Sequence, residues 1–113
     1  MKHQQALLRS QIYGDCAISY ANGGAAETRM AAAQAADELL TIAGVGASFV
    51  MYGDEQKVNI SARSYGALNV QLVMEELGGG GHQTMAAAQI KDVTFEEAAK
   101  QLVDAITTVK NSI

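Results

Sequence analysis

One stretch decides the fold of this chain: residues 57–90, which read KVNISARSYGALNVQLVMEELGGGGHQTMAAAQI. Its first part, Lys57–Ala62, alternates apolar and polar residues and is typical of a strand. Asn69 is a candidate N-cap for a short helix over Val70–Leu77, and Met85–Ile90 reads as a buried strand of small residues. The stretch therefore predicts a strand, a helix and a second strand, with glycines before the last.

The glycines Gly78–Gly81, followed by His82, also carry the main functional signal of this stretch. Residues without side chains let a bulky anion approach the backbone N–H groups, and the imidazole that follows can donate a further hydrogen bond. Arg63, near the end of the preceding strand, can bring a guanidinium to the same place. This pattern favours a phosphate-binding loop, although a flexible turn that ends a helix would have the same glycines.

The rest of the chain alternates strands with helices. We expect a strand over Ile12–Ala21, a helix capped by Thr28 and running to Ile42, and a strand over Val45–Tyr52 that forms an antiparallel hairpin with the next strand through a turn at residues 53–56. Thr94 and Glu97 form a capping-box pattern at the start of a final helix. The prediction is a single small α/β domain in which helices pack on a mixed β-sheet.

Composition limits the classes of function. With 113 residues and 49% hydrophobic content, the chain is long enough for one small core. A net charge of -4 and only six aromatic residues, four Tyr and two Phe, argue against a broad surface for nucleic acid. A nucleotide held in one focused pocket remains compatible with this charge.

A single cysteine, Cys16, excludes an internal disulfide framework and a site of several thiolates, and we expect its side chain to pack in the core. No signal peptide or membrane span is visible, so we expect a cytoplasmic domain. Residues 1–11 are helical in character and read as the end of an interdomain linker helix.

Catalytic groups are scarce. The two histidines, His3 and His82, lie far apart in the sequence, and the acidic residues have no histidine at metal-ligand spacing. The glycines are not a P-loop, because no Lys-Ser or Lys-Thr follows them. They are not a dinucleotide-binding fingerprint either, because they close a helix and do not open one. We therefore expect no catalytic residue and no metal site in this chain, which reads as a binding unit.

The combined pattern closely resembles the DHH-associated domain, the C-terminal half of DHH-family phosphoesterases. The residues that carry the resemblance are Ile60–Ser64, Asn69–Gln71, Gly79–His82 and the pair Ala86 and Ala87. Within that family, the extra glycine and the phrase Ile-Ser-Ala-Arg-Ser are most similar to cyclic-di-AMP phosphodiesterases of the GdpP type. The family pattern continues to a glycine where this chain has Ala88, which weakens the likeness to RecJ-like and oligoribonuclease members.

The resemblance implies a division of labour. Family members hydrolyse phosphodiesters with two manganese ions held by an N-terminal DHH lobe, and the associated lobe grips the substrate. It therefore implies that this chain, residues 1–113, is the substrate-binding domain of a cyclic-di-AMP phosphodiesterase and is inactive without the DHH lobe. The implied partners are a cyclic or linear dinucleotide and that lobe of the parent chain, and the sequence is compatible with either a monomer or a homodimer. The parent of the GdpP type would carry membrane segments, with this domain on the cytoplasmic side.

The resemblance also implies roles for single residues. Arg63 would pair with a phosphate, since its planar fork matches two phosphate oxygens. His82 would donate to the same phosphate, and Gly79, Gly80 and Gly81 would form the backbone cradle. Two hydroxyls are weaker candidates, because each is equally suited to capping a turn: Ser64 and Thr84. The alternative function is a nucleic-acid-binding or oligoribonuclease-type module of the same domain family.

Overall fold

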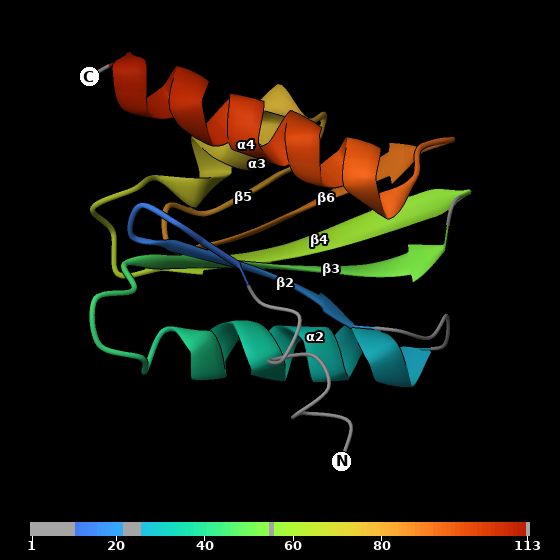
Figure 1. Ribbon diagram of the computed structural model, residues 1–113, viewed down its shortest axis with the longest axis horizontal. Helices are drawn as coiled ribbons and strands as arrows, with labels where there is room; N and C mark the ends of the chain where they lie inside the picture. Colours follow the sequence, from blue (N-terminus) through green and yellow to red (C-terminus); the bar gives the residue numbers. More distant parts are fainter. Residues whose placement is uncertain (1–10, 22–25, 55, 113) are drawn as a thin grey trace.

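The computed structural model describes residues 11–21, 26–54 and 56–112. Within these ranges the chain forms a six-stranded sheet of order β1-β2-β3-β4-β6-β5 and three helices (Figure 1). The elements are β1 (Gln11–Tyr13), β2 (Cys16–Ala21), α2 (Ala26–Leu39), β3 (Ala47–Asp54), β4 (Lys57–Ser64), α3 (Val70–Glu76), β5 (Gly80–Gly81), β6 (Met85–Lys91) and α4 (Phe95–Asn111).

The sheet is mixed, and helices cover it from both sides. β2 and β3 pair in parallel because α2 connects them, whereas every other pair of neighbouring strands is antiparallel. Figure 1 shows α3 and α4 on one face and α2 alone on the other. The predicted α/β class and the predicted hairpin of β3 and β4 are confirmed.

Alternation along the strands sends every second residue to the larger core. Phe49 and Met51 of β3 and Ile60 of β4 are almost fully buried against α3 and α4. From α4, four residues spaced three or four apart complete this core, as the sequence predicts: Ala98, Leu102, Ile106 and Val109.

The smaller core lies under α2 and depends on small side chains. Ala32 and Ala36 of α2 are fully buried against β2 and β3. Such residues let the helix approach the sheet closely, and the buried Ser48 hydroxyl donates a hydrogen bond of 2.6 Å to the Ala36 carbonyl oxygen. Cys16 is buried on the opposite face, as expected, and burial raises the pKa of its thiol to about 11. The thiol is therefore a packing group at neutral pH.

Helix caps follow the sequence closely where side chains define them. The Asn69 side chain accepts hydrogen bonds from the N–H groups of Gln71 and Leu72 at the start of α3. Thr94 and Glu97 form the predicted capping box of α4, with hydrogen bonds of 2.9 and 3.0 Å.

Several boundaries differ from the prediction. The expected strand Ile12–Ala21 is two antiparallel strands, because Gly14 takes a positive φ of 64° and turns the chain between β1 and β2. Thr28 is not an N-cap, because α2 already begins at Ala26. That helix ends at Leu39, three residues before Ile42.

Two further differences concern strands. β3 covers Ala47–Asp54, so pairing with β4 extends into the expected turn. β6 is not wholly buried: its residues alternate between exposed and buried, because only one face of this strand is covered. Gln11 belongs to β1 and not to a linker helix, while the rest of the expected linker helix and His3 lie outside the described residues.

The glycine run does three structural jobs. Gly78 (φ 86°) and Gly79 end α3, because their N–H groups donate to the carbonyl oxygens of Glu75 and Met74 at 3.1 and 2.7 Å, the two bonds of a Schellman motif. Gly80 and Gly81 then form β5, a strand that the sequence analysis missed. A Cβ atom on Gly79 would collide with the Ala87 carbonyl oxygen and lie 2.7 Å from the Ala88 Cα. Close contact between β5 and β6 therefore requires glycine.

No helix among the described residues is long and apolar enough to cross a membrane.

Replacing Gly79 and Gly80 separately tests this packing. We expect Gly79→Ala to lower the free energy of unfolding by about 1–3 kcal/mol, because its methyl group overlaps the backbone of β6. Gly80→Ala is the matched control, since a Cβ there meets no atom within 4 Å, and its effect should stay within about 0.5 kcal/mol. Urea unfolding measures both, and equal destabilisation by the two variants would contradict the close-packing explanation.

Candidate functional site

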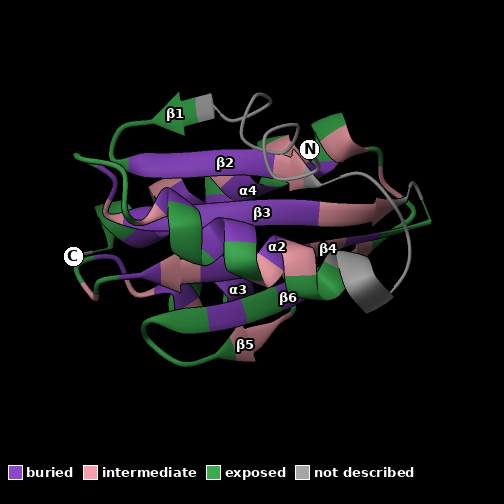
Figure 2. Ribbon diagram, turned by 90° about the horizontal axis from the view of Figure 1, so that it is seen from below, coloured by how far each residue is buried: buried purple, intermediate pink, exposed green. Residues whose placement is uncertain are grey.

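The candidate site is the part of the sheet that α2 leaves uncovered. Viewed from the α2 side, Figure 2 shows β2 buried along most of its length, whereas β6 alternates between exposed and buried residues. An open pocket of about 860 Å³ lies over this region, a size that is usual for small-molecule sites. Residues from α2, β3, β4, β5 and β6 line it, together with the loops around the glycines.

Strand register explains which side chains reach the pocket. Asn59, Ser61 and Arg63 of β4 lie two residues apart and therefore point to the same face, away from the larger core. Met85 lies directly opposite Arg63 on β6, and Gln89 lies directly opposite Asn59. The pocket thus has a floor built from two neighbouring strands.

Arg63 is the best-defined cation of the site. Its Nε donates a hydrogen bond of 3.2 Å to Asp37 Oδ1 on α2, and its Nη1 donates one of 3.0 Å to the Ala62 carbonyl oxygen. The Arg63 side chain is only 14% exposed, against 66% for Asp37. Because a guanidinium has five N–H donors, these two bonds fix its position and leave donors for a ligand.

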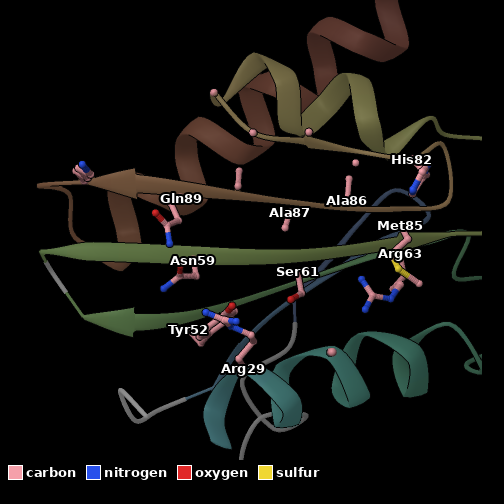
Figure 3. Close-up of a pocket in the computed structure, with 17 residues that line it drawn as sticks. Arg29, Tyr52, Asn59, Ser61, Arg63, His82, Met85, Ala86, Ala87 and Gln89 are labelled. Atoms are coloured by element: carbon pink, nitrogen blue, oxygen red, sulfur yellow. The ribbon is translucent and has the colours of Figure 1, made fainter. Parts of the chain in front are cut away.

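His82 lies at the same end of the pocket. Its backbone N–H donates to the Met85 carbonyl oxygen at 2.6 Å, which closes the tight turn between β5 and β6. Figure 3 shows the imidazole at this turn, with Met85 between it and Arg63. His82 and Arg63 line one pocket, as the sequence analysis expected: Arg63 comes from β4, and His82 comes from the turn between β5 and β6.

The glycines contribute unequally to this end. All of them line the pocket, but the N–H of Gly79 is already used by the end of α3. Gly81 has a φ of 145°, and a Cβ there would lie 2.6 Å from the Ala86 Cα. Gly80 has open space where a side chain would be. A role in approaching a ligand therefore rests mainly on Gly80, while Gly79 and Gly81 are needed for packing against β6.

The two candidate hydroxyls do not line the pocket. Ser64 points to the opposite face from Arg63, where its Oγ donates to the Gln83 carbonyl oxygen and accepts from the Gly66 N–H, both at 3.2 Å. Thr84 is exposed in the turn, and its carbonyl oxygen accepts a hydrogen bond of 3.0 Å from the Ser64 N–H. The Ser64 hydroxyl therefore has the turn role that the sequence analysis left open, whereas Thr84 contacts this loop through its backbone.

The structure adds a second end to the pocket that the sequence analysis missed. Tyr52 of β3, Asn59 of β4 and Gln89 of β6 are directly opposite one another in the sheet, and Arg29 of α2 lies beside them (Figure 3). Lys91, two residues after Gln89 on β6, also lines the pocket. The sequence could have indicated part of this end. Alternate residues of a strand point to the same face, so a strand that places Arg63 in the pocket also places residues 59 and 61 there.

Charge in the pocket is opposite to that of the whole chain. The net charge of the chain is -4, yet the charged groups that line the pocket are Arg29, Arg63 and Lys91, and no carboxylate lies among the described lining residues. A concave site lined by one sign of charge attracts anionic ligands. No group of three His, Cys, Asp or Glu side chains suited to a metal ion occurs in the described part of the chain.

Comparisons with known proteins show the family of this chain. The DHHA1 domain family matches residues 14–111. Over 76 residues the chain is 62% identical to the cyclic-di-AMP phosphodiesterase GdpP of Geobacillus thermodenitrificans. The aligned stretch covers 66% of this chain and 11% of that protein. It is 58% identical, also over 76 residues, to the cyclic-di-AMP phosphodiesterase PdeA of Listeria monocytogenes, covering 66% of this chain and 12% of that protein.

A solved structure shows the same fold. The crystal structure of an exopolyphosphatase-related protein from Bacteroides fragilis matches with a TM-score of 0.77 at 24% sequence identity, covering 96% of this chain and 34% of that one. The chain thus spans 11–12% of the length of the two phosphodiesterases and about a third of this structure.

The contact between Asp37 and Arg63 generates a prediction about anion binding. We expect Asp37→Asn to raise the affinity for pyrophosphate about two- to fivefold, because it removes a carboxylate that competes for the Arg63 guanidinium. Stability should change by less than about 1 kcal/mol, since Asp37 is largely exposed. Calorimetric titration measures the affinity, with Asp104→Asn on α4 as a control of equal charge change. A lower affinity in Asp37→Asn would instead show that Asp37 orients the guanidinium for binding.

Proposed function

The chain belongs to the DHHA1 domain family, and on this basis we propose that it is the substrate-binding lobe of a manganese-dependent phosphodiesterase that hydrolyses cyclic-di-AMP to linear di-adenylate. The observation that carries the proposal is the presence of both Arg63 and His82 at one end of an open, positively charged pocket. The likeness to two cyclic-di-AMP phosphodiesterases, at 58% and 62% identity, supports this substrate class.

In this proposal, the end of the pocket at Arg63 holds a phosphate. Two N–H groups of the guanidinium meet two phosphate oxygens, and the imidazole of His82 donates to the same group. Gly80 leaves room for the ligand beside β5, because no side chain fills the space above it. Ser64 and Thr84, which lie outside the pocket, take no part in binding.

The residues described here do not fit a manganese site, since no cluster of three metal-ligating side chains occurs among them. We therefore assign no catalytic step to this chain and propose that a DHH lobe of a longer parent chain holds the metal. That lobe would close over the pocket. The domain would work on the cytoplasmic side of the membrane. A homodimer of the parent stays a prediction.

A nucleic-acid module of the same domain family is the competing function. Its binding would need a broad basic face with several aromatic side chains for stacking bases. Here three cations, Arg29, Arg63 and Lys91, line one pocket, and Tyr52 is the one Phe, Tyr or Trp residue among the described side chains that line it. This arrangement favours a short ligand held at a defined place over a long single strand.

Substitution of the two phosphate-binding residues tests the proposal. Arg63→Ala and His82→Ala should each weaken binding of linear di-adenylate by about 1.5–3 kcal/mol, the range for hydrogen bonds to charged groups. The double variant should lose less than the sum, because both side chains serve one phosphate. Arg63→Lys should restore binding only in part, since an ammonium lacks the two-pronged geometry.

Titration of the chain with di-adenylate, followed by amide chemical shifts, measures these effects. We expect the largest shifts around Gly80 and His82. Strictly additive losses, or shifts concentrated on the far side of the sheet around α4, would place the phosphate elsewhere and contradict the proposal.

Activity of the isolated chain provides a separate test of the division of labour. We expect the 113-residue chain to bind di-adenylate without hydrolysing cyclic-di-AMP at any manganese concentration, because the described residues provide no metal cluster. Chromatographic detection of the linear product measures turnover. Manganese-dependent turnover that persists through repurification would show that the chain carries its own catalytic centre.

A further inference from the structure

The end of the pocket away from Arg63 has its own polar groups. Tyr52, Asn59 and Gln89 are directly opposite one another on β3, β4 and β6, so their Cα atoms form a row across the sheet with a spacing of about 5 Å. Asn59 and Arg63 are four residues apart on one strand, which corresponds to about 13 Å. A ligand that reaches both ends must therefore be longer than the phosphate group that Arg63 holds.

The two amides of this row are available to a ligand. Neither the Asn59 nor the Gln89 side chain makes a hydrogen bond to another described residue, and Gln89 is exposed while Asn59 is partly buried. Figure 3 shows both amide groups on the face of the sheet that carries the pocket. Arg29 and Tyr52 lie on the same face, closer to α2. The row thus combines two hydrogen-bonding groups with an aromatic ring and a guanidinium.

Each amide presents a donor NH2 group beside an acceptor oxygen, and this determines the base edge that it matches. The edge of adenine formed by N6 and N7 presents a donor beside an acceptor, which an Asn or Gln amide satisfies with two hydrogen bonds. Guanine presents two acceptors, O6 and N7, at the same edge, so that one of them would face the amide oxygen. Flat bases also stack on Tyr rings and on Arg guanidinium planes, as Tyr52 and Arg29 permit.

We infer that Tyr52, Asn59 and Gln89 form a base-recognition subsite that selects adenine in the nucleotide unit farther from the phosphate held by Arg63. This inference rests on the proposed function, because it assigns a second part of the same dinucleotide to the second end of the pocket. Asn59 and Gln89 read the base edge, and Tyr52 with Arg29 supports the flat face of the ring.

Two ligands and three variants test the subsite. The native chain, Asn59→Ala and Gln89→Met are titrated with linear di-adenylate and linear di-guanylate. Gln89→Met keeps the length of an exposed side chain and removes its amide. We expect the native chain to prefer di-adenylate, and each variant to lower that preference about fivefold or more. Gln101→Ala, an exposed amide on α4, is the matched control and should leave the preference unchanged.

Pyrophosphate separates the two ends of the pocket. Its affinity should be unchanged in Asn59→Ala and Gln89→Met, which also shows that both variants are folded, and should fall in Arg63→Ala. If the native chain binds both dinucleotides equally, or if the variants keep the native preference while Arg63→Ala weakens binding, the subsite is disproved and the proposed function stands. If Arg63→Ala binds di-adenylate as well as the native chain does, or if the native chain binds neither dinucleotide, the proposed function fails and the subsite fails with it.

Discussion

A single helix is too narrow to cover one face of a six-stranded sheet, and the site of this protein depends on that mismatch. A helix with its side chains is about 10–12 Å wide, while six strands at a spacing of about 4.8 Å span about 24 Å. On one face, α3 and α4 together cover the sheet and form the larger core with it. On the other, α2 packs through its alanines on β2 and β3 and leaves much of β4, β6 and β5 to the solvent.

β4 lies in both the larger core and the pocket that this uneven cover leaves open. Its even-numbered residues, such as Val58 and Ile60, are buried under α3 and α4, while Asn59 and Arg63 face the pocket. The same strand therefore packs in the larger core with one face and lines the pocket with the other. Because the buried face fixes the register, the positions of the polar side chains on the open face are fixed as well.

The sequence predicts the elements in this fold where side chains define them. Asn69, Thr94 and Glu97 mark helix starts by the hydrogen bonds that their side chains make, and the apolar spacing of α4 marks its buried face. β5 was missed because two glycines carry no side-chain pattern, and the boundary of α2 was misplaced because Thr28 resembles a cap. In the site, local motifs identified Arg63 and His82, but Tyr52, Asn59 and Gln89 become a group only through strand register.

Both edge strands of the sheet are unusually short, with three residues in β1 and two in β5. An exposed edge strand is a template with which another chain can pair through backbone hydrogen bonds, and long, flat edge strands promote fibrillar association. An edge strand of two glycines, such as β5, offers too few free backbone groups for such pairing. The protein can therefore keep a broad, open sheet face in water while its short edge strands offer a neighbouring molecule little to extend.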